Sequence, residues 1–163
     1  MKTLLEIIRQ SEDYLAKRPF IESPRVDGEW LIAHALGTTR MQLYLDFERP
    51  LSEDELAAIR PLLKRRAEGE PLQYITGSTE FYNSEILVGP GVLVPRPETE
   101  RLVDVALEKY SGQGDILDLC TGSGAILFAL AKQFPDAPKM IGVDNSEAAL
   151  EWAEKNLAAL QPK

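Results

Sequence analysis

Apolar side chains recur at helical spacing through residues 1–75. In the first stretch, charged residues separate Leu4, Leu5, Ile8 and Leu15, which is the 3.6-residue period of a helix with one apolar face. Similar stretches follow, so we predict a small bundle of four or five short helices in this part of the chain.

Two of these helices carry their own start and stop signals. Ser23-Pro24 is an N-cap followed by a proline at the first helical position, and Gly37 suits the end of that helix. Ser52-Glu53-Asp54-Glu55 is a capping box that begins a further helix, and Gly69 ends it. Pro61 lies inside this helix and should bend it, because proline removes a hydrogen bond from the helix.

The pattern changes over residues 76–95. Thr79–Tyr82 and Glu85–Val88 favour strands and flank Asn83-Ser84, which suits the turn of a β-hairpin. Glycines and prolines then mark loops as far as Pro97. We therefore predict that residues 76–95 form a β-hairpin linker between two domains.

From residue 96 onward helices and strands alternate. The predicted elements are a helix whose Leu102, Val103, Ala106 and Leu107 face a core, a strand Ile116–Leu119, a helix Ala125–Phe134, a strand Met140–Asp144 and a helix capped by Ser146. Such alternation is typical of a parallel sheet with right-handed crossovers. The predicted fold is therefore α + α/β, with a small helical bundle at 1–75, the hairpin linker at 76–95 and the start of a Rossmann-like domain at 96–163.

Composition and charge narrow the function. The chain is 44% hydrophobic and 27% charged, as in a soluble globular protein. Its net charge of -8 repels phosphate backbones, so we expect no direct binding of nucleic acid. With one cysteine and one histidine, we expect neither an internal disulfide nor a metal site rich in these residues. No apolar run approaches the ~20 residues of a membrane span, so we expect a cytoplasmic protein.

The segment Asp118–Gly124, between the first predicted strand and its helix, carries the candidate chemistry. Gly122 and Gly124 let a ligand approach the backbone closely, and the start of the helix attracts negative groups such as a carboxylate. Asp144 ends the second strand, where an acidic residue can hold both hydroxyls of a ribose. These features predict a nucleotide-type binding site.

Two residues discriminate between the possible nucleotides. The dinucleotide fingerprint needs a third glycine where this chain has Leu127. The Asp118 carboxylate would repel a pyrophosphate, yet it suits the ammonium group of S-adenosylmethionine. We therefore favour a methyl donor over a dinucleotide, and the absence of a GxxxxGK[ST] motif excludes a P-loop.

Several segments resemble the HemK/PrmC family of glutamine methyltransferases. They are Pro95–Glu100 (PRPETE), Asp118–Ile126 (DLCTGSGAI), the strand end Val143-Asp144, and Pro71–Gly77 at the exit of the helical region. The resemblance implies a class I methyltransferase sheet and an N-terminal domain that recognises the substrate. It also implies that S-adenosyl-L-methionine is used to methylate the glutamine of the Gly-Gly-Gln motif in class I peptide chain release factors.

The resemblance also implies roles for individual residues. The resemblance and the features of the loop together predict the cofactor-binding residues, which are Asp118, Cys120, Thr121, Gly122, Ser123, Gly124 and Asp144. Arg96, Pro97 and Thr99 would lie near the substrate, and the helical domain would grip the release factor. Many family members have glycine where this chain has Cys120, and cysteine is small enough for the loop shape to persist. We expect a monomer that needs no metal.

The chain departs from the family in one motif. The family's Asn-Pro-Pro-Tyr, which follows the fourth strand of its sheet and holds the substrate NH2, is absent, and no two prolines of this chain are adjacent. We therefore assign no catalytic residue and expect a truncated form with little or no activity, whose first strand has an open, apolar edge. The alternative is a non-catalytic module that docks a release factor through its helices and binds no cofactor.

Simpler structural roles stand beside these functional ones. Asp118 could equally cap the loop that follows it, and Cys120 is more simply a small loop residue than a nucleophile, because no histidine is placed to activate it. His34 shares a predicted helix face with Trp30 and Leu31, which favours a packed structural position over a catalytic role. Lys64-Arg65-Arg66 suits a solvated helix end, with contact to a release factor or the ribosome as the alternative. The aromatic side chains expected to pack the hinge rather than contact substrate are Tyr74, Phe81 and Tyr82.

Overall fold

The computed structural model describes residues 2–135 and 139–160. The chain divides into two compact units, residues 1–76 and 77–163. The first is helical and the second combines a β-hairpin with two parallel strands and their helices, so the predicted α + α/β fold class is confirmed. The hairpin, which we predicted as a linker over 76–95, belongs to the second unit, because its strands and turn are hydrogen-bonded to helices of that unit.

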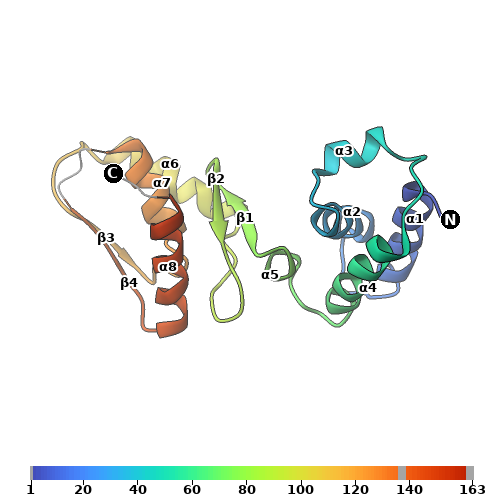
Figure 1. Ribbon diagram of the computed structural model, residues 1–163. Coiled ribbons are helices and arrows are strands. Elements are labelled where there is room, and N and C mark those ends of the chain that lie inside the picture. Colours follow the sequence, from blue (N-terminus) through green and yellow to red (C-terminus); the bar gives the residue numbers. More distant parts are fainter. Residues whose placement is uncertain (1, 136–138, 161–163) are drawn as a thin grey trace. The chain divides into compact units, whose positions relative to one another are not determined.

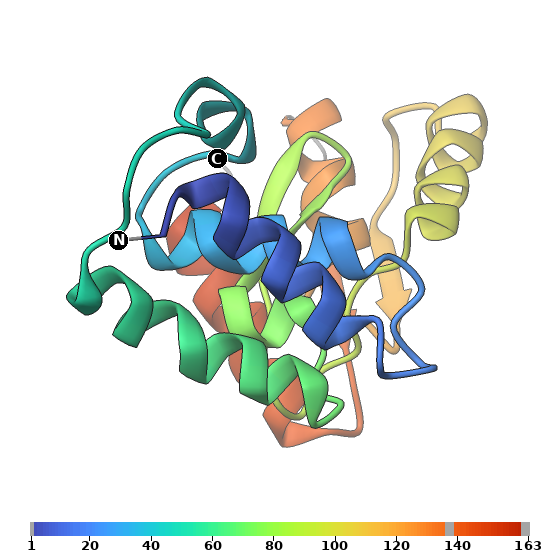
Figure 2. The same cartoon turned by 90° about the vertical axis from the view of Figure 1, so that its right-hand side faces the viewer.

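The described residues of the first unit, 2–76, form five helices, within the predicted number. They are α1 (Leu4–Leu15), α2 (Pro24–Ala35), α3 (Arg40–Leu45), α4 (Glu53–Ala67) and α5 (Leu72–Thr76), shown in Figure 1. Helices α1, α2 and α4 lie side by side (Figure 2) and enclose an apolar core. Its most buried side chains include Leu4, Ile8, Ile32 and Ile59, each at most 1% exposed.

Side chains at the helix N-termini explain where these helices begin. The predicted capping box at Ser52 is present, and Thr3 and Thr39 cap α1 and α3 in the same way. Ser23 precedes α2 as predicted, but its side chain makes no capping bond, so the proline that follows it defines this start. Pro61 lies within α4, and the helix continues past it to its predicted end.

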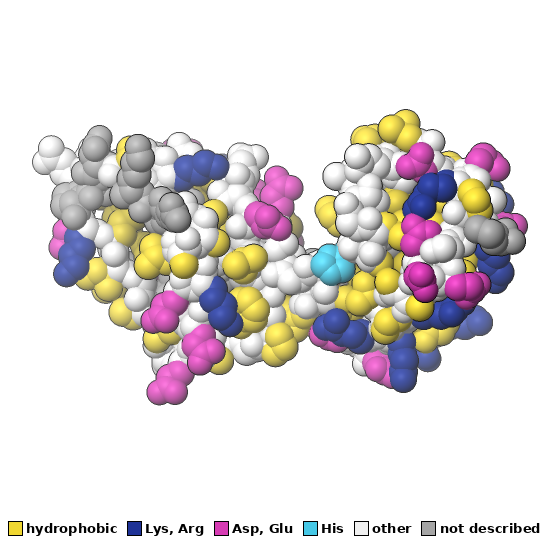
Figure 3. All heavy atoms as spheres, viewed as in Figure 1, with side chains coloured by type: hydrophobic (Ala, Val, Ile, Leu, Met, Phe, Trp, Pro, Cys, Tyr) yellow, Lys and Arg dark blue, Asp and Glu magenta, His cyan; other side chains and the backbone are white. Residues whose placement is uncertain are grey.

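The α2 face on which we predicted a packed His34 is buried at Leu31, which is 0% exposed, but not around His34 itself. Val26 and Trp30 are 38% and 46% exposed, and His34, the only histidine of the chain, lies at the surface in cyan (Figure 3). The opposite side of α2 faces α1, because Gly28 allows a close approach: a Cβ there would lie 3.2 Å from the Ser11 Cβ. The prediction for His34 was therefore wrong.

The basic end of α4 is only partly solvated. Lys64 is exposed, as predicted. Arg65 and Arg66, however, are paired with carboxylates: Arg65 with Glu70, and Arg66 with Asp27 of α2 at 2.7 Å. The Arg66 side chain is only 15% exposed. Arg66 therefore joins α4 to α2 inside the unit, in place of the solvated helix end that we predicted.

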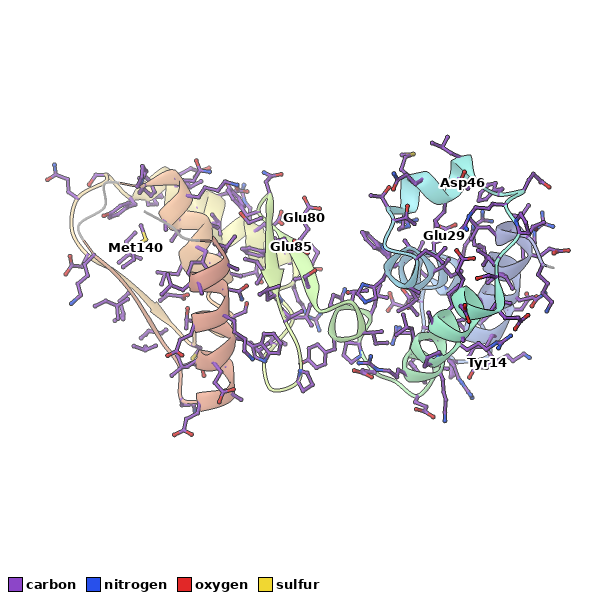
Figure 4. The ribbon with its side chains drawn as sticks, in the orientation of Figure 1. Tyr14, Glu29, Asp46, Glu80, Glu85 and Met140 are labelled. Atoms are coloured by element: carbon purple, nitrogen blue, oxygen red, sulfur yellow. The ribbon has the colours of Figure 1, made fainter. Side chains whose placement is uncertain are left out.

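Glu29 is the buried ionic centre of the first unit. It is 1% exposed and lies between α2 and α3 (Figure 4). It accepts hydrogen bonds from Arg25 at 3.0 Å, Arg40 at 2.7 Å and the Tyr44 hydroxyl at 2.8 Å. Burial raises the pKa of Glu29, but these hydrogen bonds, led by that from Arg40, outweigh burial and hold the pKa below its ordinary value. Arg40 also lies over the Trp30 ring, 5.5 Å from its centroid, so this cluster fixes α3 against α2.

The elements of the second unit follow the predicted order. They are β1 (Ser78–Phe81), β2 (Ser84–Leu87), the 3-10 helix η1 (Pro97–Thr99), α6 (Glu100–Lys109), β3 (Ile116–Leu119), α7 (Ala125–Gln133), β4 (Met140–Val143) and α8 (Glu147–Leu160). Strands β3 and β4 pair in parallel, with Leu119 opposite Val143. Among the described residues β3 pairs with β4 alone, and Leu117 and Leu119 are 58% and 67% exposed, as expected for an open apolar edge.

The hairpin turn is Tyr82-Asn83, one residue earlier than the predicted Asn83-Ser84. Both turn residues have positive φ, 48° and 56°, as a type I′ turn in a two-residue hairpin requires. Tyr82 is held there by α6, because its N–H donates to Glu100 at 2.9 Å and its hydroxyl to Asp104 at 3.2 Å. Helix α6 thus packs against the turn and α7, and Leu102, which we expected in the core, is 55% exposed.

Candidate functional site

The predicted loop starts at the end of β3 and is bonded back to β4. The carboxylate of Asp118, the third residue of β3, accepts a hydrogen bond from the Thr121 hydroxyl at 2.7 Å. The Thr121 N–H donates to the carbonyl of Val143 at 3.0 Å. Asp118 therefore caps the loop, which is one of the two roles that we left open for it.

Three residues of the loop have a left-handed backbone. Cys120, Gly122 and Gly124 have φ of 60°, 57° and 80°, a region that residues with a Cβ avoid. Gly124 comes just before α7, and a Cβ there would lie 2.4 Å from a ring carbon of Phe128, so only glycine fits. Cys120 is exposed, with a free thiol, in a backbone conformation that glycine adopts more easily.

Thr121 lies directly on strand β4. It is 8% exposed, and a Cβ on Gly142 would lie 2.8 Å from its Oγ1 and 3.0 Å from its Cγ2. Because Gly142 has no side chain, Thr121 can lie against the strand and direct its hydroxyl to Asp118. Gly142 is thus part of the site, although sequence reasoning did not single it out.

Asp144 follows β4 and holds the loop from the other side. Its two carboxylate oxygens accept the backbone N–H groups of Gly122 at 2.9 Å and Ser146 at 3.0 Å. These hydrogen bonds, led by that from Ser146, lower the pKa of Asp144. Burial raises the pKa of Asp118; the hydrogen bond from Thr121 opposes this rise and the charge of Asp144 adds to it. Two carboxyl groups of unequal acidity therefore flank the glycine loop.

The residues predicted near the substrate lie just before α6, in η1 and at its N-cap. Arg96 and Pro97 are exposed and Thr99 is half-buried, and the Thr99 N–H donates to the Arg96 carbonyl at 3.0 Å. Val92, four residues before Arg96, is buried, and a Cβ on Gly122 would lie 3.9 Å from its Cγ2. The segment that leads to Arg96 therefore approaches the loop, while the substrate role of Arg96, Pro97 and Thr99 stays a prediction.

Two residues of α8 complete the site, and sequence reasoning missed both. Asn156 is fully buried and bonds to the backbone of Leu87 and to the carbonyl of Ser123. Trp152, one turn earlier, donates its indole N–H to the Pro90 carbonyl at 3.1 Å. The available signal was a tryptophan followed four residues later by an asparagine, inside a helix rich in alanine and leucine.

The arrangement suits a positively charged ligand that carries neighbouring hydroxyls. Asp118 and Asp144 provide negative charge, which would repel a pyrophosphate. The Asp144 oxygens can each accept a further hydrogen bond, because each has a second lone pair. The glycines leave the backbone open to close approach. The site therefore fits the sulfonium and ribose of a methyl donor better than it fits a dinucleotide.

Two other features are missing from the part of the chain that the structure describes. Residues 2–135 and 139–160 contain no group of three or more His, Cys, Asp or Glu side chains arranged to hold a metal ion. Over the same residues, no helix combines the length and the apolar character needed to cross a membrane.

Sequence comparison defines the class of protein. Residues 111–163 match a model described as a methyltransferase domain, and this range contains β3, the glycine loop and β4. Residues 6–77 match the PrmC N-terminal domain, which corresponds to the helical unit. The chain thus joins a PrmC-type helical domain to the start of a methyltransferase domain.

Similar proteins identify the family. The chain is 43% identical over 154 residues to the release factor glutamine methyltransferase of Geobacter sulfurreducens, an alignment that covers 94% of this chain and 54% of that protein. Proteins of the same name in Chlorobaculum tepidum and Aliivibrio fischeri are 39% and 43% identical, over 96% and 83% of this chain and 55% and 48% of their own lengths. The chain belongs to the HemK/PrmC family, and it spans about half the length of the curated relatives it matches.

Proposed function

We propose that this chain binds S-adenosyl-L-methionine and supplies the recognition domain and cofactor loop of an enzyme that methylates class I peptide chain release factors. The methyl acceptor is the side-chain amide of the glutamine in their Gly-Gly-Gln motif. The observation that carries the proposal is the pair of carboxyl groups, Asp118 and Asp144, hydrogen-bonded to either side of the glycine loop. The name shared by the relatives supports the substrate.

The residues of the loop divide the binding of the donor between them. The pKa of Asp144 is lowered by backbone amides, so this residue stays ionised and can accept the ribose hydroxyls. Asp118, oriented by Thr121, attracts the ammonium group of the methionine part. The segment Cys120–Gly124 surrounds that part with its backbone. The bound donor supplies a methyl group on a sulfonium, which is already a good leaving group.

The substrate side is assigned to the helical unit and to the segment Arg96–Thr99. An amide nitrogen is a poor nucleophile because its lone pair is delocalised into the carbonyl, so catalysis is mainly positioning. In the family the Asn-Pro-Pro-Tyr motif does this, and the 163 residues do not contain it. We therefore infer that these residues bind the donor but need that motif to transfer its methyl group.

Methylation of a purified class I release factor tests this proposal. The 163-residue chain, and the same chain extended with the Asn-Pro-Pro-Tyr-bearing part of a relative, are each incubated with donor and release factor. We expect mass spectrometry to find one added methyl group on the Gly-Gly-Gln glutamine only after incubation with the extended chain. Asp144→Ala in the extended chain should abolish this methylation. Equal methylation by the 163-residue chain would refute the need for the motif, and no methylation by either chain would refute the substrate.

A further inference from the structure

One buried side chain joins two segments that are far apart in sequence. The Oδ1 of Asn156 accepts the Leu87 N–H at 2.7 Å, and its Nδ2 donates to the carbonyls of Leu87 at 2.9 Å and Ser123 at 3.0 Å. The side chain is 0% exposed, and both of its donors and its oxygen are engaged. No other residue type of this size offers two donors and an acceptor in one plane.

The two segments that Asn156 joins are the two sides of the proposed reaction site. Leu87 ends β2 and begins the segment that leads to Arg96. Ser123 is 2% exposed and lies between Gly122 and Gly124, the left-handed residues of the cofactor loop. A shift of either segment relative to the other therefore has to break a hydrogen bond of the Asn156 amide.

Trp152 holds residues 87–90 at a second point. Its indole N–H donates to the Pro90 carbonyl at 3.1 Å. Its ring covers Gly89, where a Cβ would lie 2.3 Å from a ring carbon. Trp152 and Asn156 are one turn apart on α8, so the helix holds residues 87–90 at two points, and of these two side chains Asn156 is the one bonded to the loop.

We propose that Asn156 is a positioning residue, which sets the distance between the donor held by the cofactor loop and the substrate held near Arg96. This inference rests on the proposed function, because it concerns the geometry of that methyl transfer. Positioning errors of about 1 Å can slow an enzyme by about a hundredfold, so a link between the two segments has direct catalytic consequences. Because Asn156 joins the loop to Leu87, binding of the donor to the loop should also stabilise residues 87–90.

Hydrogen exchange of the 163-residue chain without ligand tests the link itself. Asn156→Asp keeps the shape but places a carboxylate against the carbonyls of Leu87 and Ser123, so exchange should rise at least about tenfold both at 87–90 and at 122–126. Trp152→Phe should raise it at 87–92 only. Glu154→Gln, an exposed position on the same helix, should change neither segment. Unchanged exchange at 122–126 in Asn156→Asp would overturn the proposal.

A second arm adds S-adenosylmethionine and separates this inference from the proposed function. In the unmodified chain the donor should slow exchange both at 122–126 and at 87–90. In Asn156→Asp it should slow exchange only at 122–126. Equal protection of 87–90 in both chains would overturn the positioning role. Failure of the unmodified chain to bind the donor would count against the proposed function, and the ligand-free arm would still decide whether the link exists. If Asn156→Asp fails to fold, shown by faster exchange throughout α6, the milder Asn156→Ser replaces it in both arms.

Discussion

A methyl group added at Gly142 should destabilise the second unit through Thr121. The new Cβ would lie 2.8 Å from the Thr121 Oγ1, and Thr121 is only 8% exposed, so its side chain has to turn away. It would then give up its 2.7 Å hydrogen bond to Asp118. A hydrogen bond to a charged group contributes roughly 1.5–3 kcal/mol, and alanine in a strand gains roughly 0.5–1 kcal/mol over glycine. The net loss for Gly142→Ala should be about 1–2 kcal/mol.

The two tryptophans of the chain allow each unit to be followed separately. Trp30 lies in the first unit and Trp152 in the second, so in a Trp30→Phe chain the fluorescence during urea unfolding reports on the second unit. In this chain Gly142→Ala should lower the free energy of unfolding of the second unit by about 1–2 kcal/mol. In a Thr121→Ala background the same change should cost clearly less, because the Oγ1 at 2.8 Å and the Cγ2 at 3.0 Å are gone and only the Cβ at 3.1 Å remains. An equal loss in both backgrounds would show that Gly142→Ala does not act through Thr121.

Three further predictions use the same measurement, urea unfolding followed by tryptophan fluorescence. The folded pKa of Glu29 is lowered, so its contribution to stability is present above the unfolded value of 4.5 and is lost as the pH falls through the folded value. Glu29→Gln should lower the free energy of unfolding at pH 7 by about 3 kcal/mol and flatten this pH dependence, as measured by Trp30 fluorescence in a Trp152→Phe chain. An unchanged dependence of stability on pH would contradict the role of Glu29. Cys120→Gly should keep or raise the stability of the second unit, by up to about 1 kcal/mol, because φ there is 60°; a clear loss would show that the thiol makes a stabilising contact. Tyr82→Phe should lower that stability by about 0.5–1.5 kcal/mol, through loss of the hydroxyl bond to Asp104; this bond contributes less than that of Thr121 because it is 3.2 Å long and the Asp104 side chain is 43% exposed. No change would mean that the bond contributes nothing.

Sequence predicted the parts of the fold that local signals determine. The bounds of β3 agree with the prediction and those of β4 differ by one residue, because short apolar runs followed by glycine, aspartate and serine mark strand ends clearly. The capping box at Ser52 is present for the same reason, since its two hydrogen bonds lie within four residues. The loop Asp118–Gly124 was found through its two glycines, both of which have the left-handed backbone that only glycine adopts freely.

Features that depend on contacts between distant segments could not be predicted. His34 was placed in a core because its helix face is partly apolar, whereas the close contact between Gly28 and Ser11 turns the other face inward. The hairpin turn moved by one residue because Glu100 and Asp104 hold Tyr82. Asn156 and Gly142 were missed because their roles lie in contacts with residues at least 20 positions away.

Calorimetric titration of this chain with S-adenosylmethionine shows whether the glycine loop and Asp144 bind the methyl donor. NAD is the control ligand, and Asp115→Ala is the control for Asp144→Ala, because Asp115 is an exposed aspartate just before β3, at the strand end away from the loop. We expect saturable binding of S-adenosylmethionine by the unmodified and Asp115→Ala chains, loss of this binding in Asp144→Ala, and no binding of NAD. Binding of NAD with similar affinity, or binding of S-adenosylmethionine that survives Asp144→Ala, would contradict this expectation.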